Sequence, residues 1–213
     1  MSRFDLVIWD CDGILVDSER LAIRTESQIL TELGWPLTEA DVIELFVGRS
    51  STYMRSVIEE HLGGPVDWRG QFERRLREVS ERELVPVDGV MAALEEINIP
   101  GCVASSSGHE MLKFKLGLTG LAERFSGRIF SADDVAHGKP DPAVFLFAAA
   151  SMGVQPERCA VIEDSASGVE AGVAARMTVF AFGGGVTSPE KLQREGVVIF
   201  HAMSELPRLL VDP

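Results

Sequence analysis

The sequence predicts an α/β protein: a Rossmann-like, mainly parallel sheet covered by helices on both faces, with an inserted all-helical cap domain. Short apolar runs rich in β-branched residues alternate with segments of helical periodicity over most of the chain. One long stretch breaks this alternation and shows helical patterns only. With 213 residues, 46% of them hydrophobic, the chain is long enough to bury a core. We therefore expect a discontinuous core domain, residues 1–16 and 86–213, and a cap domain, residues 17–85.

The first predicted strand lies at the start of the chain. Residues Phe4–Asp10 form a short apolar run that ends in acidic residues and is followed by Gly13, which is typical of a buried strand that leads into a loop. The cap follows. Its apolar residues recur at helical spacing in four segments, within residues 21–34, 42–46, 53–62 and 72–79.

After Pro86 the alternation of strands and helices returns. The predicted strands are 102–105, 129–131, 159–163, 178–182 and 197–200, and the predicted helices are 90–97, 142–152 and 166–175. In open parallel sheets, ligands bind beyond the carboxyl ends of the strands. Polar clusters occur at those ends: Asp10 with Asp12, the run Ser105–Ser107, the loop carrying Lys139, and Glu163 with Asp164. The topology predicts that these clusters meet at one edge of the sheet.

Each polar cluster also has a purely structural explanation. An Asp-Gly pair such as Asp12-Gly13 is typical of a turn. A serine at a strand end, such as Ser105, often bonds to the nearby backbone, and Glu163–Ser165 has the residue types that begin a helix. The functional interpretation therefore depends on the combination.

Four carboxylates at one edge of the sheet would repel one another unless a cation lay between them. Asp10, Asp12, Glu163 and Asp164 provide hard oxygen ligands, which suit Mg²⁺. Lys139 adds one positive charge. The combination predicts a magnesium site that can accept an anionic substrate.

The same residues match the needs of phosphoryl transfer. Asp10 can attack phosphorus and form an aspartyl phosphate, and Asp12 can protonate the leaving oxygen and later deprotonate water. Ser105 and Lys139 can hold the transferred group, together with backbone amides of the loop around Gly13.

With these motifs in order, the chain resembles the haloacid dehalogenase superfamily, in its phosphatase branch with a helical cap after the first motif. The four matching segments are Asp10–Ser18 (DCDGILVDS), Val103–Ser105 (VAS), Gly138–Pro142 (GKPDP) and Val161–Ser165 (VIEDS). The resemblance implies that Asp10 is the nucleophile, Asp12 the acid/base, and Ser105 and Lys139 the phosphoryl holders. It implies Mg²⁺ bound by Asp10, the Asp12 carbonyl and Asp164, with Glu163 as a further ligand, directly or through water.

Other reactions of that superfamily fit the sequence less well. Its dehalogenases lack an acid at the position of Asp12, and its phosphonate-cleaving members use a cap lysine, whereas residues 18–86 contain no lysine. A mutase similar to β-phosphoglucomutase is the main alternative, since the run Ser105–Ser107 can bind a second phosphate. The cap histidine and lysine of that branch have no evident counterparts here, and Ala22 stands where the histidine would be. A non-catalytic regulatory domain is a further alternative.

The predicted activity is hydrolysis of a small phosphorylated metabolite, a sugar phosphate or a related phosphorylated acid. The run Gly138–Phe145 resembles sugar-phosphate phosphatases of the 6-phosphogluconate type. Substrate choice is expected to lie in the cap, where Arg49 can clamp a second anionic group with its planar fork. Gly13, Ser106 and Ser107 are the expected substrate contacts of the core.

The net charge of −13 argues against a nucleic-acid or membrane partner, and we expect a monomer or weak homodimer. The three cysteines, Cys11, Cys102 and Cys159, lie in apolar runs without metal-ligand spacing, so we expect reduced core residues. The first residues do not resemble a signal peptide, and a cytoplasmic location is expected.

Overall fold

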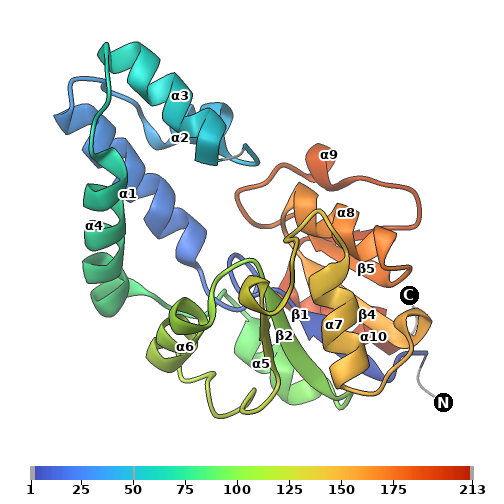
Figure 1. Cartoon of the computed structure of the whole chain (residues 1–213). Helices are drawn as coiled ribbons and strands as arrows, with labels where there is room; N and C mark the ends of the chain where they lie inside the picture. The colour runs from blue at the N-terminus through green and yellow to red at the C-terminus, as the bar shows by residue number, and fades with distance from the viewer. Residues whose placement is uncertain (1–2, 50, 212–213) are drawn as a thin grey trace. The chain divides into compact units, whose positions relative to one another are not determined.

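Six parallel strands form the centre of the larger of two units into which the structure divides (Figure 1). The computed structural model describes residues 3–49 and 51–211. The larger unit, called the core here, comprises residues 1–17 and 85–213, and the smaller one, the cap, comprises residues 18–84. Each boundary lies one residue from the position expected from the sequence.

The strands of the core follow the order β3-β2-β1-β4-β5-β6, and every pair of neighbours is parallel. Their bounds are β1 (Leu6–Trp9), β2 (Gly101–Ser105), β3 (Ile129–Ser131), β4 (Cys159–Glu163), β5 (Thr178–Phe182) and β6 (Val198–Phe200). Each of these lies at the predicted place. The predicted fold class is thus confirmed.

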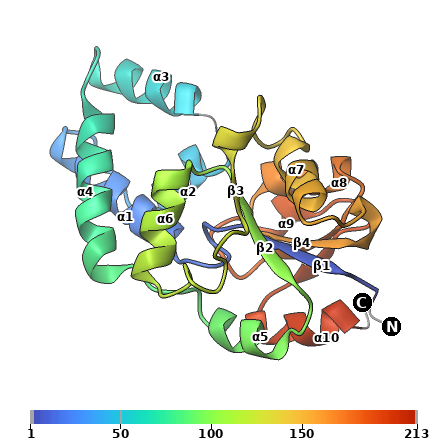
Figure 2. The same cartoon turned by 60° about the horizontal axis from the view of Figure 1, so that its bottom comes forward.

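Helices cover both faces of the sheet. Figure 2 shows α7 (Ala143–Ser151) and α8 (Ala166–Ala174) on one side and α5 (Val90–Glu96) and α10 (Leu206–Val211) on the other. The remaining core elements are α6 (His109–Leu118), α9 (Pro189–Leu192) and the 3₁₀ turns η1 (Ala132–Asp134), η2 (Pro156–Arg158) and η3 (Met203–Glu205). Helices α6, α9 and α10 were not predicted from the sequence.

One face of the sheet packs against α7 and α8 in an apolar cluster. Residues Leu6 and Ile8 of β1 pack in a cluster with Phe145 of α7 and Val169 of α8, and all four are almost inaccessible to solvent. Burial on both faces explains why the strands are continuous apolar runs instead of alternating ones. Cys11, Cys102 and Cys159 are buried with free thiols, which confirms their prediction as core residues.

The strand order changes direction between β1 and β4. From β1 the chain builds outward through β2 to β3, and it then returns to the other side of β1 with β4. Trp9 pairs with Ile162, and the Asp10 amide donates to the Ile162 carbonyl at 3.0 Å. A crevice outside the strand ends at such a switch point is the usual ligand site of this architecture.

The two chain segments that lead into and out of the cap run side by side within the core. The Asp17 amide donates to the Val85 carbonyl at 3.0 Å, and the Val87 amide donates to the Leu15 carbonyl at 3.1 Å. Val16 also forms an antiparallel bridge with Pro86. The two segments are therefore hydrogen-bonded to each other within the core, at the point where the cap is inserted.

The cap consists of four helices, and all four predicted helical segments are present. They are α1 (Ser18–Glu32), α2 (Glu39–Phe46), α3 (Ser51–Leu62) and α4 (Trp68–Glu83). Helix α1 packs against α4 and α2 through a buried stripe that includes Leu21, Ile29 and Leu30. Thr38 and Asp41 form a capping box at the start of α2. Over the described ranges of core and cap, no helix combines the length and apolar character needed to cross a membrane.

Candidate active site

The loop after β1 turns sharply and brings two aspartates to the edge of the sheet. The amides of Leu15 and Val16 both donate to the Cys11 carbonyl, and Gly13 has a φ of 72°. A left-handed φ is easiest for glycine, so an Asp-Gly turn fits here. Asp10 is buried with 6% of its surface exposed, whereas Asp12 is partly accessible.

Lys139 lies in the centre of the site and joins three strand ends. Its Nζ donates to Asp10 Oδ1 at 2.5 Å, to Glu163 Oε1 at 2.6 Å and to the Ala104 carbonyl at 3.1 Å. The ammonium group also lies 4.6 Å from the ring centre of Phe145. The Lys139 side chain is only 2% exposed, and an ammonium has three protons to donate. Lys139 is therefore a fixed cation beside the predicted nucleophile.

Glu163 is held at both of its carboxylate oxygens. While Oε1 accepts from Lys139, Oε2 accepts from the amides of Asp164 and Ser165 at 3.0 and 2.9 Å and from the Ser165 hydroxyl at 2.9 Å. The Ser165 hydroxyl in turn accepts from the Gly168 amide and so caps α8. A Cβ atom at Gly168 would lie 1.8 Å from Glu163 Oε1, so the glycine makes room for this carboxylate.

The charges of the site shift the pKa values of its members. Burial, with Glu163 and Asp12 nearby, raises the pKa of Asp10 to about 7 although Lys139 lowers it. Burial lowers the pKa of Lys139, but the carboxylates of Asp10 and Glu163 raise it above its usual value overall. The lysine thus stays charged, whereas burial favours the protonated form of Asp10.

Asp12 has its own partners, one of which, Lys115, was not predicted from the sequence. Lys115 of α6 places Nζ 2.5 Å from Asp12 Oδ1, and the Ser107 hydroxyl donates to Asp12 Oδ2 at 2.9 Å. The Ser107 amide donates to the hydroxyl of Ser105, which is buried at the end of β2. Burial lowers the pKa of Lys115, but Asp12 raises it above its usual value overall. No motif pointed to Lys115, because the helix that carries it was not predicted.

The donors at this edge fit a magnesium ion. In the part of the chain that the structure describes, no three His, Cys, Asp or Glu side chains are arranged to hold a metal. Both oxygens of Glu163 are already bonded within the protein. Asp10 and Asp164 remain as buried carboxylates at the ends of β1 and β4. Mg²⁺ often takes one or two carboxylates and completes its octahedron with water and substrate oxygens.

The other predicted substrate residues are dispersed. Ser106 is exposed beside the Asp12 partners in the core. Arg49 belongs to the cap, where its guanidinium lies 5.4 Å from the ring centre of Tyr53. Arg49 also lines a cavity of about 260 Å³ inside the cap, together with Glu26 and Met54. Burial raises the pKa of Glu26 to about 7.

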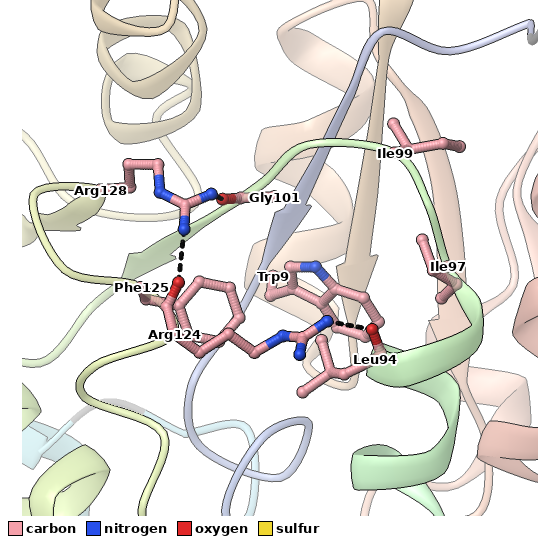
Figure 3. Close-up of a pocket in the computed structure, with 8 residues that line it drawn as sticks. All are labelled: Trp9, Leu94, Ile97, Ile99, Gly101, Arg124, Phe125 and Arg128. Atoms are coloured by element: carbon pink, nitrogen blue, oxygen red, sulfur yellow. Dashed lines mark hydrogen bonds between the residues drawn. The ribbon is translucent and has the colours of Figure 1, made fainter.

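Another cavity, of about 140 Å³, lies in the core, and none of the predicted site residues line it (Figure 3). It surrounds the indole of Trp9. Figure 3 shows the guanidinium of Arg124 bonded to the Leu94 carbonyl and that of Arg128 bonded to Gly101. These arginines tie the segment before β3 to α5 and to the start of β2. The predicted catalytic residues lie elsewhere, around Asp10.

A family model and curated relatives match most of the chain. The sequence model of the haloacid dehalogenase-like hydrolases matches residues 4–176. The 6-phosphogluconate phosphatase of Escherichia coli K12 is 29% identical over 214 residues, which cover 98% of this chain and 96% of that protein. A phosphorylated carbohydrates phosphatase of Thermotoga maritima is 32% identical over 174 residues, or 78% of this chain and 79% of that protein.

Solved structures extend the comparison to the fold. A conserved haloacid dehalogenase-like protein of unknown function from Agrobacterium tumefaciens has a TM-score of 0.89 and 36% identity, with 97% of each chain covered. A family hydrolase from Deinococcus radiodurans, solved with bound phosphate and sodium, has a TM-score of 0.84 and 29% identity over the full length of both chains. The strand order, the motif positions and these matches agree, and the chain belongs to the haloacid dehalogenase-like hydrolases.

Proposed function

We propose that this chain is a Mg²⁺-dependent phosphatase that hydrolyses a small phosphorylated metabolite through an aspartyl phosphate on Asp10. The observation that carries the proposal is the contact between Lys139 and both Asp10 and Glu163 at the switch point of the sheet. A buried carboxylate at that point, beside a fixed ammonium group, is suited to attack a phosphorus whose oxygens the cation neutralises.

The proposed reaction has two steps. In the first, an Asp10 oxygen forms a bond to phosphorus while the ester P–O bond breaks, and Asp12 gives its proton to the leaving oxygen. In the second, Asp12 takes a proton from water, whose oxygen attacks phosphorus and frees Asp10 and inorganic phosphate. Ser105 and Lys139 hold the transferred group in both steps, with backbone amides around Gly13 as further donors.

Asp10, Asp164 and the Asp12 carbonyl are the proposed magnesium ligands. When bound, the ion would offset the negative charge of these carboxylates and of the substrate oxygens. Glu163 is left out of this set because its oxygens already bond to Lys139, to two amides and to the Ser165 hydroxyl. We assign it the task of holding Lys139 in place.

A sugar phosphate or a related phosphorylated acid is the proposed substrate class. The curated relatives are named as phosphatases of 6-phosphogluconate, of phosphorylated carbohydrates and of hexitols, and they support this choice. Arg49 is proposed as the cap group that binds a second anionic part of the substrate, and Ser106 and Ser107 as contacts from the core.

The proposal is tested with p-nitrophenyl phosphate as a general substrate. Turnover is expected with Mg²⁺, to stop with excess EDTA, and to fall at least about 10³-fold in Asp10→Asn, because the nucleophile is lost. Asp88→Asn changes an exposed aspartate of the core and serves as the matched control, with turnover like the original chain.

Two outcomes would contradict the proposal. Turnover that survives both EDTA and Asp10→Asn would exclude the mechanism. Incubation with a hexose 1-phosphate separates hydrolysis from the mutase reaction, since a phosphatase releases inorganic phosphate whereas a mutase yields the 6-phosphate isomer.

A further inference from the structure

Lys115 is a charged residue of the site. Neither the sequence motifs nor the proposed mechanism assigns it a role. Its side chain is only 12% exposed, and its Nζ lies 2.5 Å from Asp12 Oδ1 and 3.4 Å from the Ser107 hydroxyl. A lysine is rarely buried to this extent unless it is paired. The contact joins residues 103 positions apart in the sequence, so it depends on the tertiary fold.

The helix that carries Lys115 is fixed to the core at several points. Leu112 and Leu116, which flank Lys115 on α6, are fully buried and set the rotation of the helix. At its start, the His109 amide donates to Asp133 at 2.9 Å, and the His109 ring lies 2.9 Å from an oxygen of Asp134. The ammonium group therefore extends toward Asp12 from a rigid support.

Asp12 is held at each carboxylate oxygen by a different element. Lys115 binds Oδ1 from α6, and the Ser107 hydroxyl binds Oδ2 from the loop after β2. A hydroxyl can turn from donor to acceptor, whereas an ammonium group can only donate. Oδ2 can thus carry a proton while Oδ1 stays on Lys115, so the contact is compatible with an acid in the first step.

We propose that Lys115 is a positioning residue that fixes the Asp12 carboxyl group in the orientation needed for proton transfer to the leaving oxygen. This inference rests on the proposed function, because it gives Asp12 the part of acid and base. The consequence is specific. In the first step, Lys115 matters for esters whose leaving oxygen must be protonated, and little for esters whose leaving group departs as a stable anion.

The test is the hydrolysis of substituted phenyl phosphates by Lys115→Met, which keeps the length of the side chain and removes the ammonium group. We expect kcat/KM for phenyl phosphate, which reports the first step alone, to fall about 10-fold or more, a part of the 10²–10⁴-fold that acid–base catalysis typically supplies. For p-nitrophenyl phosphate the fall should stay within about 2-fold, since the same catalysis is hardly needed there.

Lys113→Met is the matched control, because Lys113 is exposed on the same helix. It should behave as the original chain with both esters. In an Asp12→Asn background, Lys115→Met should cause no further loss, since a residue that acts through Asp12 has nothing left to position. Lys115→Gln keeps a hydrogen-bond donor and should show a smaller dependence on the leaving group, so the test does not depend on one variant being folded.

Other results would overturn the inference. They are an equal loss of kcat/KM for both esters, or a further loss in the Asp12→Asn background. The two proposals fail separately. If Asp10→Asn abolishes turnover but Lys115→Met treats both esters alike, only the role of Lys115 is wrong; if turnover persists in Asp10→Asn, the proposed mechanism itself is wrong.

Discussion

Gly168 and Glu163 determine where Lys139 lies, although neither has a proposed part in the reaction. Glu163 holds Lys139 beside Asp10, and the space for Glu163 exists because residue 168 has no side chain. A chain of contacts thus leads from Gly168, near the start of α8, through Glu163 to Lys139, which bonds to the proposed nucleophile Asp10. We therefore expect a methyl group added at residue 168 to change the position of Lys139.

Gly168→Ala should therefore lower turnover. The added Cβ would lie 1.8 Å from Glu163 Oε1, so the carboxylate has to move away and Lys139 loses one of its anionic partners. We expect kcat with p-nitrophenyl phosphate to fall about 10-fold or more, since displacing a positioning group by about 1 Å can cost about 10²-fold.

Gly172→Ala on the same helix is the control for that variant. Its Cβ would lie 2.6 Å from a methyl group of Val179 in the core, away from the Lys139 contacts, so it should lower the unfolding temperature but not the kcat of the folded protein. Equal kcat in the two variants would contradict the chain of contacts.

At the scale of helices and strands, the sequence predicted those elements whose residues are uniformly apolar or strictly periodic. The six strands were found because both faces of the sheet are buried. Helix α6 was missed because its apolar residues do not share one face: Leu112 and Leu116 are buried, but Met111 and Leu118 are 40% and 41% exposed.

Site residues near strand ends could be predicted from the sequence, whereas those that only tertiary packing brings to the site could not. Asp10 and Lys139 were identified because strand ends meet in a parallel sheet, whatever the details of packing. Lys115 lies on α6 and reaches Asp12 only through the tertiary fold, so no local pattern marks it. Glu163 was predicted as a metal ligand from its residue type, and its bond to Lys139 could not be inferred from the sequence.

Helix α1 of the cap carries a pH dependence of stability. Burial raises the pKa of Glu26 from 4.5 to about 7, so between these values the folded state keeps a proton that the unfolded state has released. The stability of the cap should therefore fall as the pH rises from about 4.5 to about 7. Glu26→Gln removes the charge and should stabilise the protein at pH 8 on the order of 3 kcal/mol, but hardly at all near pH 4.

Urea unfolding of the original chain and of Glu26→Gln at several pH values measures this difference. Glu44→Gln, which changes an exposed glutamate of α2, is the control and should leave the stability difference near zero throughout. A Glu26→Gln effect that does not vary with pH would show that the carboxyl group is not titrating in this range.

For the whole molecule, the paired segments at the insertion point allow the core to be considered apart from the cap. The Asp17 amide and the Val85 carbonyl lie 3.0 Å apart, so a short glycine-serine turn can join them in place of residues 18–84. The apolar cluster of the sheet lies entirely within the core residues. We expect the shortened chain to unfold cooperatively, as monitored by circular dichroism, and a gradual, non-cooperative melt would contradict this.

The burial of the three cysteines has a practical consequence. Burial raises the pKa of Cys11 well above its usual value, that of Cys102 to about 12 and that of Cys159 to about 11. Because the thiolate is the reactive form, maleimides and similar reagents should find no ready target on the native chain. A fluorophore or spin label can thus be attached to one engineered surface thiol without first removing the natural sulfhydryl groups.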